Sequence, residues 1–371
     1  MKILIAGDYR PSGYAEDCFN IGDYSSMLSE VKKIVTQADY SIVNIESPIV
    51  EHEAKPIIKC GPNLKGGFCC LSALQWAGFN CATLANNHFL DFGEIGVKDT
   101  LDGCKRLSID TVGGGMSIEE ASKILYKEVA GQRLAIINCC ENEFSIATEK
   151  TPGSNPLNPT QQYYDIQQAR KNADRVLVIV HGGIEHFKLP SPRMVETYRF
   201  FIDAGADAVV NHHQHCYSGY EVYKGHPIFY GLGNFFFFSS RDRSGSWTEG
   251  YVVMIDFSGD LPTYELLPYI QNAADWGIFF QKSDYYNKDL DMLNKIIADP
   301  MALKHEVEQY YKNNTEGITN VFEPVQNKLY LYAKYKGWLP SFISRDRKLR
   351  TKNVVYCESH LDKLKWWLAQ S

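Results

Sequence analysis

The chain has 371 residues, of which 44% are hydrophobic and 22% are charged, close to ordinary globular usage. These values exclude intrinsic disorder and fibrous structure, and the length suffices to bury a sizeable core. The net charge of −6 is uneven, because residues 325–371 hold ten Lys or Arg against three Asp or Glu. An acidic body with a basic tail argues against a general nucleic-acid-binding protein.

Short apolar runs alternate with amphipathic segments over the first 215 residues. In chain order, the sequence predicts strands at 2–6, 39–43, 79–84, 109–113, 134–140, 175–180 and 208–210, and helices at 71–78, 101–107 and 194–204. This alternation indicates a layered α/β core. Polar residues able to bind a metal directly follow five of these strands, and strand ends in α/β sheets converge on one edge.

The pattern changes after residue 226. Residues 227–238 and 249–257 predict a pair of antiparallel strands, and residues 289–311, 323–336 and 360–369 predict helices. We therefore expect residues 1–260 to form the α/β domain and residues 261–371 to form a mainly helical C-terminal extension.

The cysteines and the N-terminus bear on the cellular compartment. Ten cysteines without a CxxC pair are typical of buried thiols in a reducing compartment. The first eight residues lack the long apolar core of a secretory signal, and no apolar run reaches the roughly 18 residues of a membrane span. We expect a cytoplasmic protein.

The densest group of candidate metal ligands is Asn211-His212-His213-Gln214-His215, directly after a predicted strand. Neutral imidazole is the commonest metal-ligating side chain. A His-x-His pair at a strand end suits one or two divalent metals. The alternative is a polar surface loop.

Further candidates follow other strands. Asp8 and Glu46 are strand-end carboxylates suited to a hard metal, and Asn87 offers an amide oxygen. His88 fits a general acid or a contact to a phosphoryl oxygen. The alternative for the Asn86-Asn87 pair is an ordinary turn, and Asp91 fits a turn or helix N-cap residue as well as it fits a residue of the site.

A third histidine-containing segment follows the strand at 175–180. His181 precedes two glycines, which allow close backbone approach. Glu185 and His186 come next and fit either direct ligation or support of a ligating histidine. For His186, a surface position is the alternative that we favour.

These residues lie in stretches that occur in a known family. The stretches are Ala6–Asp8, Val43–Pro48, Ala85–Gly93, His181–Glu185, Asp203–His215 and Tyr230–Phe235. Through them the chain resembles the CapA-like poly-γ-glutamate capsule synthesis proteins, within the calcineurin-like metallophosphoesterase superfamily. The resemblance covers roughly residues 1–257.

The resemblance implies an α/β, calcineurin-like metallophosphoesterase fold: a central two-layer β-sandwich flanked by helices, with a metal site at strand ends. It implies one or two divalent ions, Mn, Fe or Zn. The residues that match the family's metal-site motifs are Asp8, Glu46, Asn87, His181, His213 and His215, with Glu46 at the bridging carboxylate. His88 matches the catalytic proton donor, whereas His212 lies outside the motif.

The chain also departs from the superfamily pattern. The usual Asp-x-His is Asp8-Tyr9-Arg10 here, so the first-site histidine is missing and that site is expected to be weak or empty. Arg10 is placed to occupy this space and bind an anion directly. Together with His88 and Glu185, Arg10 completes the candidate catalytic set.

The leading hypothesis is a metal-dependent hydrolase that cleaves a phosphoester in capsule or polysaccharide biosynthesis, on a phosphorylated or polymeric anionic substrate and alongside other capsule biosynthesis proteins. One alternative is an amide-bond hydrolase or ligase accessory in poly-γ-glutamate synthesis; the sequence has no GxxxxGK[ST] phosphate loop. Another is a polyglutamate- or polysaccharide-binding scaffold with a degenerate metal site. The basic tail is a candidate for contact with an anionic polymer, a membrane surface or the body itself, and its aromatic residues equally fit an amphipathic helix that packs on its own domain.

Overall fold

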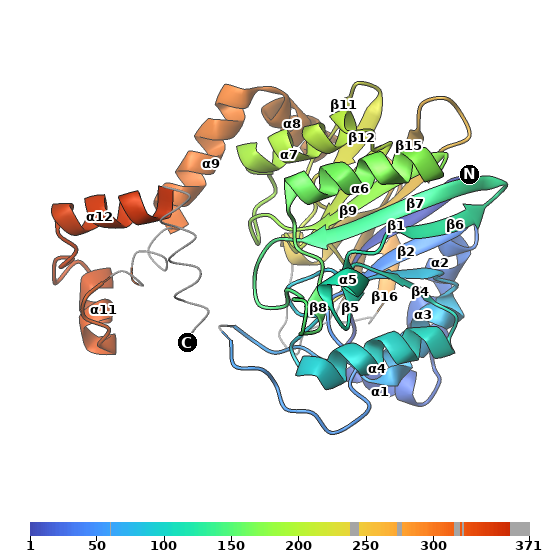
Figure 1. Cartoon of the computed structure of the whole chain (residues 1–371), viewed down its shortest axis with the longest axis horizontal. Coiled ribbons are helices and arrows are strands. Elements are labelled where there is room, and N and C mark those ends of the chain that lie inside the picture. Colours follow the sequence, from blue (N-terminus) through green and yellow to red (C-terminus); the bar gives the residue numbers. More distant parts are fainter. Residues whose placement is uncertain (60, 238–244, 273–276, 315–319, 321–322, 357–371) are drawn as a thin grey trace. The chain divides into compact units, whose positions relative to one another are not determined.

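The structure is a computed structural model that describes residues 1–371 except 60, 238–244, 273–276, 315–319, 321–322 and 357–371. The chain divides into two compact units, residues 1–304 and residues 305–371. Two large β-sheets and the helices around them make up the larger unit (Figure 1).

The first sheet is built around β1 (Lys2–Arg10), which is buried on both faces. Its order is β16-β15-β14-β1-β2-β3-β4, and β13 pairs with the second half of β1. The other strands are β2 (Tyr40–Ile45), β3 (Cys81–Thr83), β4 (Asp110–Val112), β13 (Asn234–Phe237), β14 (Glu249–Asp256), β15 (Thr263–Asn272) and β16 (Gly277–Phe280). Strands β1 to β4 and β13 run parallel, whereas β14, β15 and β16 pair in antiparallel fashion.

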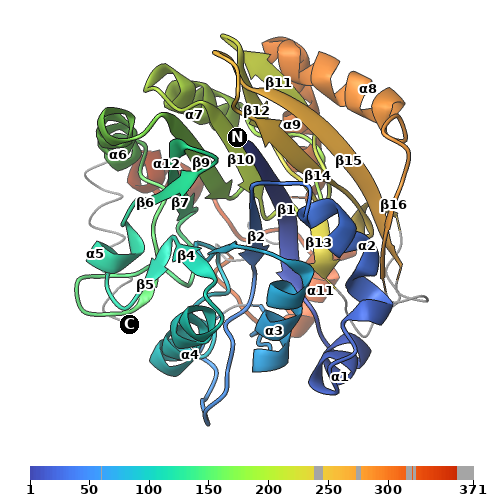
Figure 2. The ribbon, with the colours of Figure 1, turned by 90° about the vertical axis from the view of Figure 1, so that its right-hand side faces the viewer.

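The second sheet has the order β11-β12-β10-β9-β7-β6. Its strands are β6 (Leu125–Val129), β7 (Gln132–Cys140), β9 (Arg175–His181), β10 (Ala208–His212), β11 (Tyr220–Tyr223) and β12 (His226–Phe229). The four central strands run parallel. A separate pair joins β5 (Gly114–Gly115) to β8 (Gly153–Ser154). Figure 2 shows both sheets from a second direction.

Helices cover the outer faces of both sheets. They are α1 (Tyr14–Asn20), α2 (Ser25–Val35), α3 (Phe68–Ala77), α4 (Gly93–Arg106), α5 (Ile118–Ala121), α6 (Pro159–Asn172), α7 (Pro192–Asp203) and α8 (Asn287–Ala298), with a 3₁₀ turn at Gly245–Trp247. The next helix, α9 (Pro300–Asn314), begins in the larger unit and continues into the smaller one. Leu4 and Ala6 of β1 belong to one core cluster with α1 to α4, whereas Ile3 and Ile5 lie on the opposite face. Helices α6 and α7 cover the second sheet (Figure 1). The expected two-layer β-sandwich flanked by helices is confirmed.

The predicted antiparallel pairing of residues 227–238 with residues 249–257 is wrong. β12 belongs to the second sheet, β13 pairs in parallel with β1, and β14 pairs with β1 and β15. The chain crosses between the sheets at residues 230–233, where Gly233 has φ of 82°. An aromatic, β-branched run predicts a strand but does not determine its partner.

The boundary expected after residue 260 does not match the division of the structure. β15 and β16 continue the first sheet, and the division falls after Lys304. The helix expected at 289–311 is interrupted at Asp299, because a residue before proline disfavours helical backbone. The segment 360–369 lies outside the described residues.

The smaller unit contains α11 (Lys328–Tyr335) and α12 (Arg345–Tyr356). Its buried Glu323 accepts a hydrogen bond of 3.0 Å from the Tyr330 hydroxyl and pairs with Lys334 at 3.3 Å. Ser341 donates to the same carboxylate at 2.5 Å. In the part of the chain that the structure describes, the helices are too short or too polar to cross a bilayer.

Candidate metal centre

All six predicted metal ligands lie close together and are buried. They follow or end parallel strands from both sheets: Asp8 lies in β1, Glu46 follows β2, Asn87 follows β3, His181 ends β9, and His213 and His215 follow β10. Residues from 8 to 215 thus reach one place between the sheets.

Glu46 joins two groups of potential ligands. Its Oε1 lies 3.6 Å from His181 Nε2 and 3.8 Å from His215 Nε2. Ligand atoms of Glu46, His181 and His213 lie within 4.8 Å of one another, and so do those of Asp8, Glu46 and His215. We call the first set, together with the neighbouring Asn87, the His181 group and the second set the Asp8 group, so Glu46 belongs to both. A carboxylate shared in this way suits two neighbouring divalent cations.

Glu46 also provides a test of whether a cation fits. The side chain is 0% exposed, and neither carboxylate oxygen has a hydrogen-bond partner among the described residues. A buried carboxylate without a partner is costly, and buried charges are normally paired or coordinate metals. The donor set of carboxylate, imidazole and amide oxygen therefore fits a divalent metal.

Burial controls the protonation of these residues. It raises the pKa of Glu46 well above its usual value, and it raises the pKa of Asp8 to about 7. Burial lowers the pKa of His181 and of His215 well below the usual imidazole value. Both rings are therefore neutral, as metal ligation requires.

In the His181 group, three neutral donors face one another. His181 Nε2 lies 3.1 Å from Asn87 Oδ1 and 3.1 Å from His213 Nδ1. With Glu46 they form a four-residue set drawn from four strand ends, the ligand number of a typical zinc site.

In the Asp8 group, hydrogen bonds hold Asp8 and His215. Asp8 Oδ1 accepts from Asn44 Nδ2 at 2.7 Å, and Asp8 Oδ2 accepts from the His213 backbone N–H at 3.1 Å. His215 Nδ1 lies 2.9 Å from Asn234 Oδ1, which can only accept, so Nδ1 carries the proton and Nε2 is left to bind a metal.

The backbone is strained where it positions these ligands. His213 has φ of 92° and His215 has φ of 56°, in the left-handed region that non-glycine residues rarely adopt. These turns, rather than continued strand alternation, bring both rings to the site. At Gly7 any side chain would collide with the Gly233 carbonyl oxygen, so glycine lets β1 approach the segment that carries Asn234.

The predicted catalytic residues lie in different surroundings. His88 is buried, and its Nδ1 lies 2.6 Å from Asp91 Oδ2. Arg10 is half-buried and donates to Ser12 Oγ at 3.0 Å, and burial lowers the pKa of Arg10. Glu185 is exposed. Its negative charge adds to the rise that burial causes in the pKa of Glu46, and it opposes the fall that burial causes in the pKa of His213. The catalytic roles of these three residues stay predictions.

Two other histidines lie near the site. His212 is buried in β10, and neither of its ring nitrogens has a hydrogen-bond partner among the described residues. His186 is exposed, as expected, with its ring centroid 5.8 Å from that of His215.

Three supporting residues were not assigned these roles from sequence. Asn44 and Asn234 both lie in the quoted family stretches without a predicted role; Asn44 donates to Asp8, and Asn234 accepts from His215. Lys59 forms an ion pair with Asp91 and belongs to no motif. Lys59 is 29 residues from His88 in the chain, so local sequence gave no signal for this contact.

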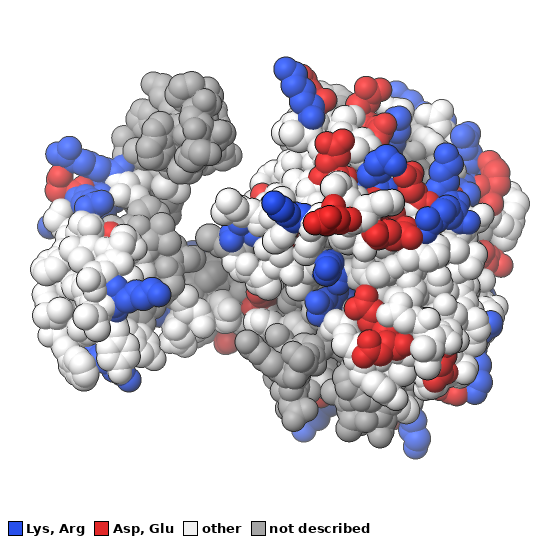
Figure 3. Space-filling model, turned by 90° about the horizontal axis from the view of Figure 1, so that it is seen from below, with Lys and Arg blue, Asp and Glu red and all other residues white. Residues whose placement is uncertain are grey.

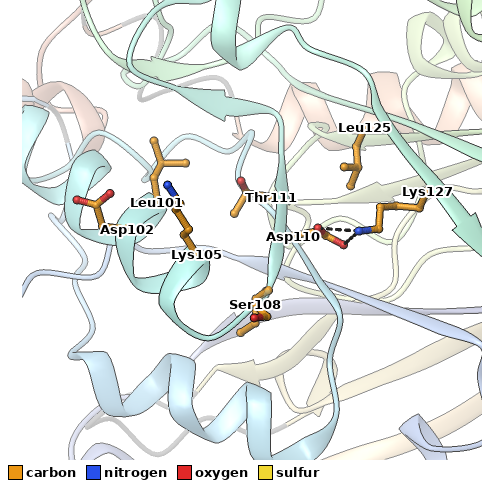
Figure 4. A pocket seen from close by; sticks show the side chains of 9 residues that line it. Leu101, Asp102, Lys105, Ser108, Asp110, Thr111, Leu125 and Lys127 are labelled. Carbon is orange, nitrogen blue, oxygen red and sulfur yellow. Dashed lines mark hydrogen bonds and ion pairs between the residues drawn. The ribbon is translucent and has the colours of Figure 1, made fainter.

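Other features of the larger unit lie apart from these ligands. A hollow of about 610 Å³ borders α4, β4 and β6, and the ion pair of Lys127 with Asp110 at 2.8 Å lies in it (Figure 4).

Basic and acidic side chains are interspersed on the face shown in Figure 3. Eight described cysteines are free thiols, as expected.

Comparison with known proteins places these features in a family. The family model described as "Bacterial capsule synthesis protein PGA_cap" matches residues 2–239. The chain is 33% identical over 245 residues to "Capsule biosynthesis protein CapA" of Bacillus anthracis, covering 64% of this chain and 60% of that protein. It is 33% identical over 240 residues to "PGA biosynthesis protein CapA" of Bacillus subtilis, covering 64% and 63%. The match thus spans less than two thirds of either relative.

Among solved structures, a 5′-nucleotidase precursor from Thermus thermophilus is similar with a TM-score of 0.45 and 12% identity, covering 79% of this chain and 57% of that chain. The family model covers more than half of the sequence, including all six predicted metal ligands. The chain therefore belongs to the bacterial capsule synthesis protein PGA_cap family.

Proposed function

We propose that the protein is a metal-dependent hydrolase that cleaves a phosphoester during capsule or poly-γ-glutamate synthesis. The observation that carries the proposal is Glu46, a fully buried carboxylate without a hydrogen-bond partner among the described residues, shared by two ligand groups. The printed names of the two Bacillus relatives support the capsule and polyglutamate context.

The ligands of the proposed centre divide between two positions. Glu46, Asn87, His181 and His213 would hold one cation, and Asp8, Glu46 and His215 would hold a second. A bound divalent cation would lower the pKa of a coordinated water and polarise the phosphoryl group. Mn, Fe and Zn all suit this donor set.

The remaining steps belong to this chain's own side chains. Asp91 accepts the Nδ1 proton of His88, and in the imidazolium form of His88 the second proton, on Nε2, is available for donation. Water attacks phosphorus, the bond from phosphorus to the leaving oxygen breaks, and His88 gives its proton to that oxygen and regains one from the attacking water through solvent. The Arg10 guanidinium binds the non-bridging phosphoryl oxygens.

The test is hydrolysis of p-nitrophenyl phosphate and bis-p-nitrophenyl phosphate by protein loaded with Mn²⁺ or Zn²⁺. We expect His213→Ala to lose both activity and bound metal. His305→Ala is the control, since His305 is an exposed residue of α9, and it should keep both. Activity in His213→Ala with metal retained would refute the assignment.

The same protein is then offered poly-γ-glutamate and γ-glutamyl amides. Turnover of the amides alone would replace phosphoester cleavage by amide hydrolysis. Tight polymer binding without turnover in any metal would replace the enzyme by a binding accessory.

A further inference from the structure

Lys59 places a buried ammonium group beside the predicted proton donor. Its side chain is 2% exposed, and its Nζ lies 3.1 Å from His88 Nδ1. The same ammonium pairs with Asp91 Oδ1, and the ring of Phe144 lies 5.2 Å from it. Lysine is rarely this buried unless it is paired.

Asp91 connects this ammonium to His88. Its Oδ1 faces Lys59, and its Oδ2 lies 2.6 Å from His88 Nδ1 and accepts from the Leu64 backbone N–H at 2.6 Å. Groups on both sides therefore fix the orientation of this carboxylate. The imidazole it holds then presents Nε2 away from the Lys59–Asp91 pair.

The loop that carries Lys59 is anchored without this side chain. The Ile57 backbone N–H donates to the Asp91 carbonyl at 2.9 Å, and Asn63 Nδ2 donates to the same carbonyl at 3.0 Å. Leu64 holds the other end of the loop at the Asp91 side chain. Because three other contacts fix the loop, a buried lysine is not needed for that purpose.

We propose that Lys59 is a positioning residue for His88. By holding the Asp91 carboxylate, it keeps the imidazole oriented to give its Nε2 proton to the leaving oxygen, an inference that rests on the proposed phosphoester cleavage. Partners of this kind typically contribute about 10–100-fold to activity.

The experiment compares Lys59→Met in two backgrounds, wild type and His88→Gln, with an activated aryl ester (p-nitrophenyl phosphate) and an alkyl phosphate. In the wild-type background we expect kcat to fall about 10–100-fold for the alkyl ester and far less for the aryl ester, whose leaving group needs little protonation. In the His88→Gln background, Lys59→Met should cost almost nothing more, because residues that act as a unit are not additive.

The control is Lys65→Met, which removes the same charge from an exposed position in the same loop and should leave both rates unchanged. Where Lys59→Met does not fold, Lys59→Leu takes its place, since it also removes the donor to Asp91. An equal loss in both backgrounds, or an equal loss with both esters, would overturn the proposal.

A second readout separates this inference from the proposed function. If the wild type hydrolyses no phosphoester, the proposed function fails, and the ¹⁵N signals of the His88 imidazole then decide. They should change in Lys59→Met and stay as in wild type in Lys65→Met. Unchanged signals in Lys59→Met would overturn the positioning role by themselves.

Discussion

The two ligand groups that share Glu46 are held in different ways. In the His181 group, neutral nitrogen and oxygen atoms of three residues face one another at about 3.1 Å. In the Asp8 group, Asn44 and the His213 backbone already occupy both Asp8 oxygens, and Asn234 holds His215. Arg10 stands where the resemblance leads us to expect a first-site histidine.

The two groups therefore differ in the number of candidate ligands that each would offer to a cation. Glu46 included, the His181 group offers four candidate ligands, whereas the Asp8 group offers three. We therefore infer that a cation binds more tightly in the His181 group.

The largest expected effect is the change with pH in the stability of metal-free protein that the buried Asp8 carboxyl group causes. Burial raises the folded-state pKa of Asp8 from 3.8 to about 7. Between these values the folded state keeps a proton that the unfolded state has lost, so stability falls as pH rises from about 4 to 7, by about 4 kcal/mol. Urea unfolding at a series of pH values measures this loss, which Asp8→Asn should reduce. Stability that rises over this range would contradict the prediction.

Removing a ligand of the fuller group should have the next largest effect. Substituting a residue that only hydrogen-bonds to a metal ligand typically costs up to roughly 100-fold in activity. We expect His181→Ala, which removes a ligand itself, to lower kcat by more than that. Steady-state hydrolysis of p-nitrophenyl phosphate measures this, with elemental analysis of the same sample. A His181→Ala protein that keeps near-wild-type activity would remove the His181 group from the mechanism.

Substituting a residue that supports His215 without itself binding metal should weaken only the cation in the Asp8 group. Asn234→Ala removes the acceptor that fixes His215 and should weaken the lower-affinity cation about 10–100-fold. The higher-affinity cation should stay unchanged in a Mn²⁺ titration of the metal-free protein. Equal weakening of both cations would show that the two groups do not act separately.

The smallest expected effect is a gain in affinity for the lower-affinity cation. Arg10→His restores the superfamily's Asp-x-His and should strengthen the lower-affinity cation by less than about tenfold, because only one ligand is added to a site not shaped around it. KM for p-nitrophenyl phosphate should rise in the same variant, since the guanidinium is lost. A fall in KM would argue against anion binding by Arg10.

Much of this site could be predicted because its ligands follow apolar strands. The runs before Asp8, Asn87 and His181 each predict a buried strand, and their ends meet in the structure. The same runs indicated a layered α/β core, and the family resemblance implied the two-layer β-sandwich. The structure brings the six residues together in a buried cluster, and their role as metal ligands stays a prediction.

Contacts between distant parts of the chain could not be predicted in this way. Lys59 reaches His88 from a loop without periodicity, and Asn234 lies beside Asp8 because β13 pairs with β1. β15 and β16 were assigned to a helical extension, although they complete the first sheet. Strand partners depend on tertiary packing, which the alternation of residues within one segment does not specify.

The most direct measurement is calorimetric titration of metal-free protein with Mn²⁺, without an affinity tag, for the wild type and for Glu46→Gln. The shared role of Glu46 predicts two cations of unequal affinity in the wild type and weaker binding of both in the variant. No binding by the wild type, or wild-type binding by Glu46→Gln, would contradict the central claim that Glu46 joins two metal-ligand groups.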